Sequence, residues 1–447
     1  MREYVVVGLL LCAGAASIAG AQQDTWTTDA ARRIGLRLVE SRNASGPPAY
    51  PVQAGDLLFF TNVGTSYGAK NPKNSVVVID AKTKKPIAVS DLEPAWSEKW
   101  TSHGIGVAPD GRYVYLPGMA PMAASNPGSL LVLDGRSLKI HQIITSPAQR
   151  PHHVKTFEDW MGRRRVLVED FNWLGRGQMA AQQGTGFYVM DPMDNNKVIG
   201  GMTPGDLRGT PYAGFTAPDG RYLYYSMPGP EFVLAHHLKG WLAKIDMQTW
   251  TVVQNLPTAA YPIWTVFSRD GRFAWTTHAG EAKVLKIERG NAPGQFDKVA
   301  GEAHTGPGPY GLAIAVDERE LWVADKGEGV APGQRKTTVT VIDTATNQVK
   351  QTIDTKCVTN DHVIAAPDGT EMWATCNASH EIVVLDTKTY QVKARIPMPN
   401  QGDSHGGTFV YYTKGPSGIV AEVVADQNGL HGSARDAARK GTPWTAR

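Results

Sequence analysis

The sequence predicts an all-β fold, a seven-bladed β-propeller built from four-stranded antiparallel blades. Three observations predict it: a turn motif that recurs along the chain, a strand pattern that recurs seven times, and a composition rich in turn residues. The chain has 447 residues, of which 42% are hydrophobic and 19% charged, as in globular proteins. Its 47 glycines and 29 prolines favour many tight turns. The net charge of +3, without a long basic run, excludes nucleic acid as an expected partner.

A short apolar run, a turn of the Pro-Asp-Gly type and an aromatic-rich run recur together. These units span residues 107–115, 216–224, 267–275, 315–322 and 365–373. Each unit predicts a β-hairpin, because the turn chemistry lies between two alternating runs. The step from Asp110 to Asp219 is about twice the later steps, which places a degenerate copy near Trp160–Arg163.

An apolar alternation that ends in an acidic residue counts the blades independently. Its seven ends, separated by 42 to 57 residues, are Asp80, Asp134, Asp191, Asp246, Glu288, Asp343 and Asp386. Another short apolar run follows most of them, so each unit holds the four strands of a propeller blade. Two unrelated β-sandwiches, the alternative fold, would not produce this count. The first unit lacks an innermost strand and residues 405–412 resemble a solitary one, so we expect a C-terminal strand to close the ring in blade one.

The first residues predict a secretory signal. An apolar run over residues 5–18 leads to the small-residue site Ala19–Ala21; a lipid anchor on Cys12 is the alternative. No other apolar stretch reaches the roughly 20 residues of a membrane span, so we predict a periplasmic or secreted protein. The expected segments are a signal peptide over 1–21, an N-terminal extension over 22–48, the propeller over 49–412 and a C-terminal extension over 413–447.

Cys357 and Cys376 are the two cysteines that remain after the signal. The turn at Asp368–Gly369 pairs the two inner strands of blade seven, so Cys376 should lie opposite a residue near Asp361. Cys357 precedes that residue by a few positions and can fold back. We expect a disulfide that closes a loop of about 20 residues, with two separate buried thiols as the alternative.

Innermost strands line the channel of a propeller, and their first residues converge at one mouth. When these strands are aligned on their turns, histidines begin them in four neighbouring blades. These histidines are His103, His152, His153, His362 and His405. Opposite them the same positions hold Tyr212, Trp264 and Tyr310, which we expect to contact a cofactor. Because side chains alternate along a strand, only one ring of the His152–His153 pair should point into the channel.

This arc of imidazoles predicts a transition-metal site, and copper suits an exported protein with nitrogen ligands and no thiol. Ligand nitrogens that share an ion should lie within about 5 Å of one another. The alternative is that each histidine only bonds backbone groups at its strand end. Asp361, Glu169 and Lys70 are candidate catalytic groups, with ordinary solvated charge as the alternative, and residues 171–179 are long enough to fold over the mouth.

The Asp-Gly-Arg-Tyr hairpins and the segment Val341–Asn347 resemble the seven-bladed YVTN-repeat propellers, a group that includes the heme d1 propellers. This resemblance covers residues 50–412 and implies the fold. The shorter segment Pro151–Leu167 is similar to the His-His-Val segment of the nitrous oxide reductase propeller, whose superfamily includes the copper enzyme thiocyanate dehydrogenase. A four-copper cluster is not expected, because Tyr212, Trp264 and Tyr310 stand where further histidines would be needed.

The sequence therefore predicts an exported propeller with a histidine-ringed transition-metal site, copper being the expected ion. We expect it to oxidise or reduce a small molecule and to exchange electrons with an exported electron-transfer protein. The alternative is a non-catalytic YVTN-type propeller that binds a tetrapyrrole, a peptide or a protein partner. Histidines could ligate a heme d1-like tetrapyrrole axially, although the chain has no Cys-x-x-Cys-His motif for covalent heme.

Overall fold

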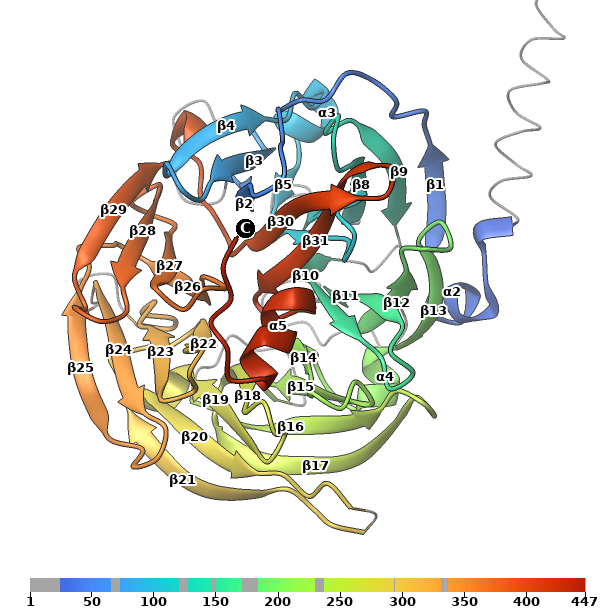
Figure 1. Ribbon diagram of the computed structural model, residues 1–447. Coiled ribbons are helices and arrows are strands. Elements are labelled where there is room, and N and C mark those ends of the chain that lie inside the picture. Colours follow the sequence, from blue (N-terminus) through green and yellow to red (C-terminus); the bar gives the residue numbers. More distant parts are fainter. Residues whose placement is uncertain are drawn as a thin grey trace, which may run out of the picture.

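The computed structural model describes residues 25–65, 73–119, 128–145, 150–170, 184–229, 237–292, 294–330, 334 and 337–446. Seven antiparallel sheets surround one axis (Figure 1). The all-β fold and the seven blades of four antiparallel strands are therefore confirmed. The predicted signal peptide over 1–21, Lys70 and the segment 171–179 lie outside the described residues.

Five blades contain four strands in chain order, from the innermost outward. Blade three is β10 (Pro151–Glu158), β11 (Arg164–Asp170), β12 (Phe187–Asp191) and β13 (Lys197–Met202). Blade four is β14 (Gly214–Thr216), β15 (Tyr222–Met227), β16 (Lys239–Asp246) and β17 (Thr251–Ala260). Blade five is β18 (Pro262–Phe267), β19 (Phe273–His278), β20 (Lys283–Glu288) and β21 (Lys298–His304). Blade six is β22 (Leu312–Ile314), β23 (Glu320–Ala324), β24 (Thr338–Asp343) and β25 (Val349–Asp354). Blade seven is β26 (Asn360–Ala365), β27 (Glu371–Cys376), β28 (Glu381–Asp386) and β29 (Val392–Pro397).

Blade one joins the two ends of the chain. Its strands are β30 (Thr408–Gly415), β2 (Leu57–Val63), β3 (Ser75–Asp80) and β4 (Lys85–Val89). The innermost strand β30 pairs antiparallel with β2, with Phe409 opposite Phe59. Phe59 also packs on Trp373 of blade seven, with ring centroids 4.7 Å apart. The predicted closure of the ring by a C-terminal strand is thus confirmed.

Blade two gains an outer strand from the N-terminal extension. It contains β5 (Thr101–Ser102), β6 (Gly106–Val107), β7 (Tyr113–Met119), β8 (Ser129–Asp134) and β9 (Ile140–Thr145), and β1 (Arg37–Ser41) pairs with β9. The short helix α2 (Asp29–Ile34) precedes β1 and packs toward blade three, where the Thr28 hydroxyl donates to the Val198 carbonyl at 2.7 Å. The helices α3 (Pro94–Ser97) and α4 (Pro204–Leu207) and the 3₁₀ turns Ala279–Glu281 and Pro399–Gln401 complete the connections.

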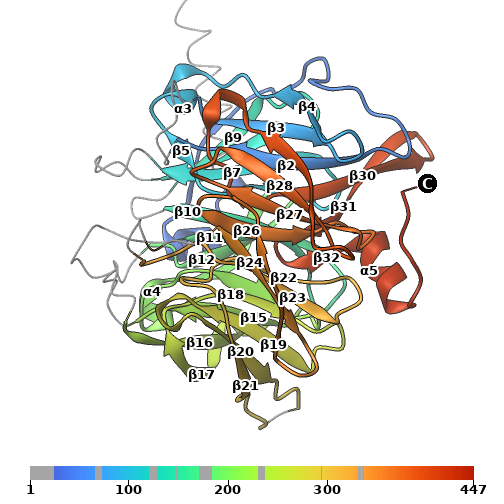
Figure 2. The same cartoon turned by 90° about the vertical axis from the view of Figure 1, so that its left-hand side faces the viewer.

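The C-terminal extension enters the channel. Strand β31 (Gly418–Asp426) pairs with β30 on its inner side, followed by β32 (Gly429–Leu430) and helix α5 (Gly432–Arg439), which lies at one end of the ring axis (Figures 1 and 2). The Val423 amide donates to the carbonyl of Pro109, in the hairpin turn of blade two, at 3.0 Å. The extension therefore covers the end of the channel where the hairpin turns lie, away from the starts of the innermost strands.

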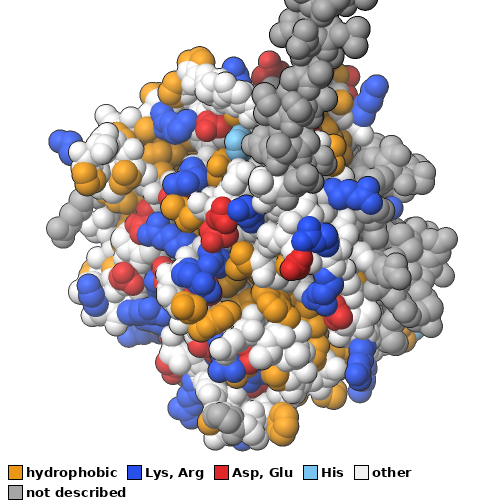
Figure 3. Space-filling view, turned by 90° about the vertical axis from the view of Figure 1, so that its right-hand side faces the viewer, with side chains coloured by type: hydrophobic (Ala, Val, Ile, Leu, Met, Phe, Trp, Pro, Cys, Tyr) orange, Lys and Arg blue, Asp and Glu red, His pale blue; other side chains and the backbone are white. Residues whose placement is uncertain are grey.

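The outer surface of the ring is mixed in character. On the side over β1, β13 and α2, basic, acidic and apolar side chains are interspersed (Figure 3). Among the described residues no helix is both long and apolar enough to cross a membrane.

Cys357 and Cys376 are joined by a disulfide in the structure, with Cα atoms 5.3 Å apart. Asn360 lies opposite Cys376 in the ladder of β26 and β27. It is the residue next to Asp361, near which the sequence predicted the position opposite Cys376. Both sulfur-bearing residues are fully buried. The bond fastens the loop that enters β26 to the end of β27, and so holds the strand on which Asp361 and His362 stand.

We predict that the chain without residues 1–21 contains no free thiol when it is unfolded without reductant. Replacing both cysteines with alanine should lower the free energy of unfolding by about 3 kcal/mol, because the closed loop restricts the unfolded chain. Thiol labelling in denaturant and urea unfolding measure these two quantities. Two reactive thiols per chain would contradict the disulfide.

Candidate metal centre

The first residues of the innermost strands depart from regular alternation in several blades. In blade three the register shifts between Pro151 and Val154, and the same shift occurs between Pro262 and Thr265 and between Asn360 and Val363. Such irregularities re-aim side chains because the ladder is interrupted. His152 and His153 are consequently both buried in one cluster, with ring centroids 4.0 Å apart. The expectation that only one of the two rings points inward was wrong for this reason.

Glycines between blades allow the histidines to approach. A Cβ atom on Gly104 would lie 2.4 Å from the carbonyl oxygen of His152 and 2.8 Å from Nδ1 of His153. A Cβ atom on Gly311, at the corresponding position of blade six, would lie 2.6 Å from the Cα of His362. Larger side chains at these two positions would push the neighbouring strand starts away from the mouth.

The five predicted histidines form one continuous cluster. The ring of His103 lies 3.9 Å from that of His405 and 4.6 Å from that of His152, measured between centroids. The ring of His153 lies 4.9 Å from that of His362. His103 is the partly accessible member, whereas the other four are buried. The mouth thus brings together imidazoles from blades one, two, three and seven, with access from the side of His103.

Two of these rings make no hydrogen bond within the described part of the chain. Neither nitrogen of His153 and neither nitrogen of His362 has a partner among the described residues, although His153 is 0% and His362 1% exposed. Burial lowers the pKa of His153 well below its ordinary value, and nearby His152 and His362 lower it further. Burial likewise lowers the pKa of His362 to about 3, although the Asp361 carboxylate opposes this. Both rings are therefore neutral, with lone pairs directed into the protein.

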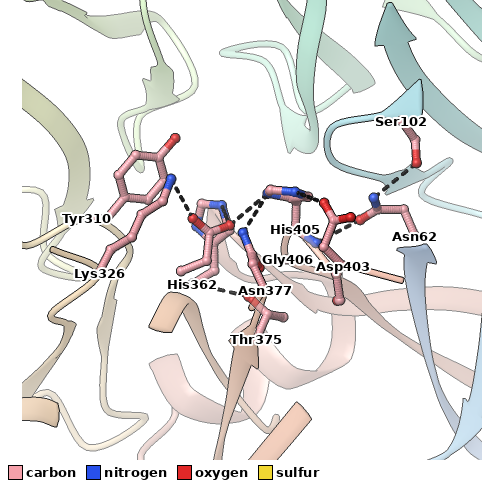
Figure 4. Close-up of polar contacts among 12 residues, drawn as sticks. Asn62, Ser102, Tyr310, Lys326, His362, Thr375, Asn377, Asp403, His405 and Gly406 are labelled. Atoms are coloured by element: carbon pink, nitrogen blue, oxygen red, sulfur yellow. Dashed lines mark hydrogen bonds and ion pairs between the residues drawn. The ribbon is translucent and has the colours of Figure 1, made fainter. Parts of the chain in front are cut away.

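His405 is held differently, between two buried carboxylates. Its Nδ1 lies 2.9 Å from Asp361 Oδ2 and its Nε2 lies 2.6 Å from Asp403 Oδ2 (Figure 4). Burial alone would lower the pKa of His405, but Asp361 and Asp403 outweigh it and raise the pKa to about 9. His405 is therefore cationic at neutral pH, and both of its N–H groups donate. To bind a metal it would have to lose a proton and one of these bonds.

Asp361 connects His405 to a buried lysine. Its Oδ1 lies 2.8 Å from Nζ of Lys326, and Oδ2 lies 3.2 Å from Nε2 of His362. Burial would raise the pKa of Asp361, but the rings of His362 and His405 and the ammonium of Lys326 outweigh it and hold the pKa well below its usual range. The Lys326 ammonium also lies 3.6 Å from the centre of the Tyr310 ring (Figure 4). Asp361 is thus an ionised carboxylate inside the protein, rather than the solvated strand cap that was the alternative.

Glu169 approaches the cluster from β11. One ligand atom from each of His152, His153 and Glu169 lies within 4.8 Å of the others. Glu169 Oε1 forms an ion pair with Lys155 and accepts the Gly214 amide at 2.9 Å, whereas Oε2 has no hydrogen-bond partner in the described ranges. Burial raises the pKa of Glu169 and lowers that of Lys155, and each partner opposes the other's shift. The Glu169 carboxylate and the two imidazoles form a mixed nitrogen and oxygen donor set.

The predicted aromatic residues line the other side of the cluster. The Trp264 ring lies 4.4 Å from that of His362, and the Tyr212 ring lies 5.3 Å from that of His152. The hydroxyls of Tyr212 and Tyr310 are 2.6 Å apart. These rings enclose the histidines in a low-dielectric wall. Whether they contact a cofactor stays a prediction.

Three charged residues of the site were not predicted from the sequence: Lys155, Lys326 and Asp403. Lys155 and Asp403 each lie two positions from a predicted histidine, and Lys326 follows the end of β23. Glu169, which was predicted, lies at the equivalent place in blade three, just before the end of β11. A charged residue near the end of a second strand was therefore the pattern that could have identified Lys326. Lys70 lies outside the described residues, so its catalytic role stays a prediction.

The comparisons with known proteins agree with the fold. No family model matches the chain, and no curated protein matches it in sequence. The periplasmic gluconolactonase PpgL of Pseudomonas aeruginosa is similar in structure, with a TM-score of 0.56 and 17% identity over 80% of this chain and 100% of that one. The dihydro-heme d1 dehydrogenase NirN, solved in complex with DHE, has a TM-score of 0.52 and 16% identity over 84% of this chain and 80% of that one. Hydrazine synthase of Kuenenia stuttgartiensis has a TM-score of 0.52 and 18% identity over 70% and 90%.

At these identities the likeness establishes the fold alone. The predicted resemblance to the heme d1 propellers is confirmed at that level. The local likeness to the nitrous oxide reductase propeller stays a prediction.

We predict that Lys155→Met destabilises the protein by about 3–5 kcal/mol, because it leaves the Glu169 carboxylate buried without its partner. The double variant Lys155→Met with Glu169→Gln should recover most of this loss, since it removes the uncompensated charge. Urea unfolding of the three proteins at pH 7 measures the difference. A single variant as stable as the parent would show that Glu169 is not charged in the parent.

Proposed function

We propose that the channel mouth binds a transition-metal ion, copper being the expected one, and that the site oxidises or reduces a small molecule. The observation that carries the proposal is the pair of buried imidazoles, His153 and His362, whose nitrogens have no hydrogen-bond partner among the residues that the structure describes. A buried polar group without a partner costs about 1–3 kcal/mol, and a bound ion would supply the missing partner. Copper cycles between two oxidation states and so would supply one-electron chemistry at this position.

The residues divide into two roles. His152, His153 and Glu169 would hold the ion, because one donor atom of each lies within 4.8 Å of the others. His362 and His103 flank this set, and His103 is the member that an incoming small molecule can reach. Water and substrate would therefore enter next to His103, while the covered end of the channel stays closed by the C-terminal extension.

His405 and Asp361 would manage protons and charge. His405 is cationic between Asp361 and Asp403, and its ring lies 3.9 Å from that of His103, on the accessible side. It can donate a proton to a substrate reduced beside His103 and recover it through the two carboxylates. An electron-transfer protein outside this chain would supply or remove the electron, as the sequence argument expects.

A small ion fits this mouth better than a tetrapyrrole does. Neighbouring histidine rings lie 3.9 to 4.9 Å apart, so no macrocycle can lie between them without separating the strand starts. NirN, which is similar to this chain in fold, was solved in complex with DHE, and the tetrapyrrole hypothesis is therefore carried as an outcome of the test.

The protein is first stripped of metal with a chelator and then loaded with copper. We expect it to retain stoichiometric copper after gel filtration and to show nitrogen coupling in its electron paramagnetic resonance spectrum. His153→Phe should lose most of this copper. The matched control is His278→Phe, because His278 at the end of β19 is equally buried and lies outside the cluster. Copper retained equally by His153→Phe, or not retained by the parent, would refute the metal site. An intense absorption band after titration with hemin, without copper binding, would favour the tetrapyrrole alternative.

We also predict that copper binding tolerates acid. The pKa of His362 is about 3 and that of His153 is well below 6.5, so both rings stay in the neutral, ligand form as the pH falls from 7 to 5. For imidazoles of ordinary pKa, each ligand would cost about 25-fold in affinity over that interval. Equilibrium dialysis at pH 7 and pH 5 should therefore show a loss well below that for one ordinary ligand. If copper affinity instead fell by the full factor for each of several ordinary ligands, these rings would have ordinary pKa values.

A further inference from the structure

A cavity of about 130 Å³ lies at the turn end of the channel, against the C-terminal extension. Innermost strands β14, β18, β22 and β26 form one wall, and the turn after β31 together with α5 forms the other. None of the five clustered histidines, and none of Tyr212, Trp264 and Tyr310, lines this cavity. The cavity is therefore a separate feature from the candidate metal centre.

The strand wall of the cavity is apolar. It is lined by Val266, Leu312, Ile314, Ala365 and Val363, together with Phe157 of blade three. A dry cavity of about 150 Å³ in another protein accommodates benzene, so this one has the size for an aromatic or short aliphatic body. Burial of apolar surface against this wall would favour such a body by about 25 cal/mol per Å².

A buried amide without partners lines the same cavity. Gln427 is 5% exposed, and neither its side-chain oxygen nor its nitrogen makes a hydrogen bond to any described residue. The amide packs on Gly406, where a Cβ atom would lie 1.6 Å from the Gln427 nitrogen. Because a buried amide is costly when unpaired, this side chain offers one donor and one acceptor to a ligand.

The acidic groups around the cavity are engaged by partners, whereas one donor atom of Arg435 is not. Glu158 is paired with Nη2 of Arg435 at 2.8 Å, and Asp426 with Nε2 of His431 at 2.7 Å. Glu318 accepts the backbone amide of Arg269. In contrast, Nε of Arg435 is buried, and no described residue accepts a hydrogen bond from it.

Arg439 adds a second cation one helical turn along α5. It is exposed, and it makes no hydrogen bond or ion pair with the described part of the chain. Arginines four positions apart lie on the same face of a helix, so both guanidinium groups can serve one anion.

We propose that this cavity binds a small organic anion, with an apolar body against β18, β22 and β26 and a carboxylate at Arg435 and Arg439. The Gln427 amide would form a hydrogen bond with the polar atom of the ligand that lies nearest the strand wall. Such a ligand bridges α5 and the ring, and so it fastens the C-terminal extension across the channel. The site does not depend on the metal proposed for the opposite mouth.

Phenylacetate is the probe, and phenethylamine is the matched control with the same ring and the opposite charge. Calorimetric titration of the chain without residues 1–21 should show saturable phenylacetate binding and none of phenethylamine. Arg439→Gln should weaken binding at least fivefold, about the effect of one exposed ion pair at the upper end of its range, and Arg37→Gln should leave it unchanged. Arg439 and Arg37 are both exposed, so neither substitution endangers the fold.

Ala365→Phe should abolish binding by filling the cavity, and its thermal unfolding reports whether the fold is intact. His153→Phe should bind phenylacetate as the parent does, which separates this site from the metal centre. The proposal would be overturned if phenylacetate showed no saturable binding up to about 10 mM, which corresponds to a binding free energy weaker than about −3 kcal/mol. Equal binding of phenethylamine, or undiminished binding by folded Ala365→Phe, would overturn it as well.

Discussion

The pairing of β30 with β2 is the constraint on which both ends of the channel depend. It joins residues more than 300 positions apart, such as Phe409 and Phe59, and it closes a ring that the other six blades leave open. His405 lies three residues before the start of β30, and its backbone amide donates to Asn62 on β2 at 2.9 Å. The same strand carries β31 on its inner side. Without this pairing, nothing would hold His405 between its two carboxylates or place the C-terminal extension over the channel.

The cluster is unfavourable for folding by itself. His153, His362, Glu169 and Lys155 are all at most 1% exposed, and several of their polar atoms have no partner. Isolated polar groups of this kind reduce stability, and proteins retain them chiefly where function requires them. The surrounding blades supply the compensation: Thr375 accepts the backbone amide of His362 at 3.1 Å, and Thr277 accepts that of Trp264 at 3.0 Å. In blade three the corresponding position is Glu169, which places a carboxylate where other blades place a hydroxyl.

The fold and the set of histidines could be predicted because both follow from local, repeated patterns. The turn motif fixes each hairpin, and a fixed distance from the turn identifies the first residue of each innermost strand. The orientation of His152 and His153 could not be predicted, because it depends on the register shift between Pro151 and Val154, which alternation does not encode. Lys326 was missed because it acts on Asp361 of the next blade, a contact that only the ring creates.

The path of residues 413–447 was also beyond the sequence argument, since alternation in β31 identifies a strand but not its partner. In the structure its closing turn spans the channel: Asp426 accepts the Thr156 amide at 2.9 Å, and Asn428 accepts the Thr216 amide at 3.2 Å. Thr156 and Thr216 lie on the innermost strands of blades three and four, between their starts and their hairpin turns. This layer of polar contacts divides the channel into a mouth of buried imidazoles and carboxylates and an apolar cavity edged by arginines. Because the side chains of Asp426 and Asn428 fasten this turn to backbone amides of two blades, the two compartments stay separated and keep distinct chemistries on one ring.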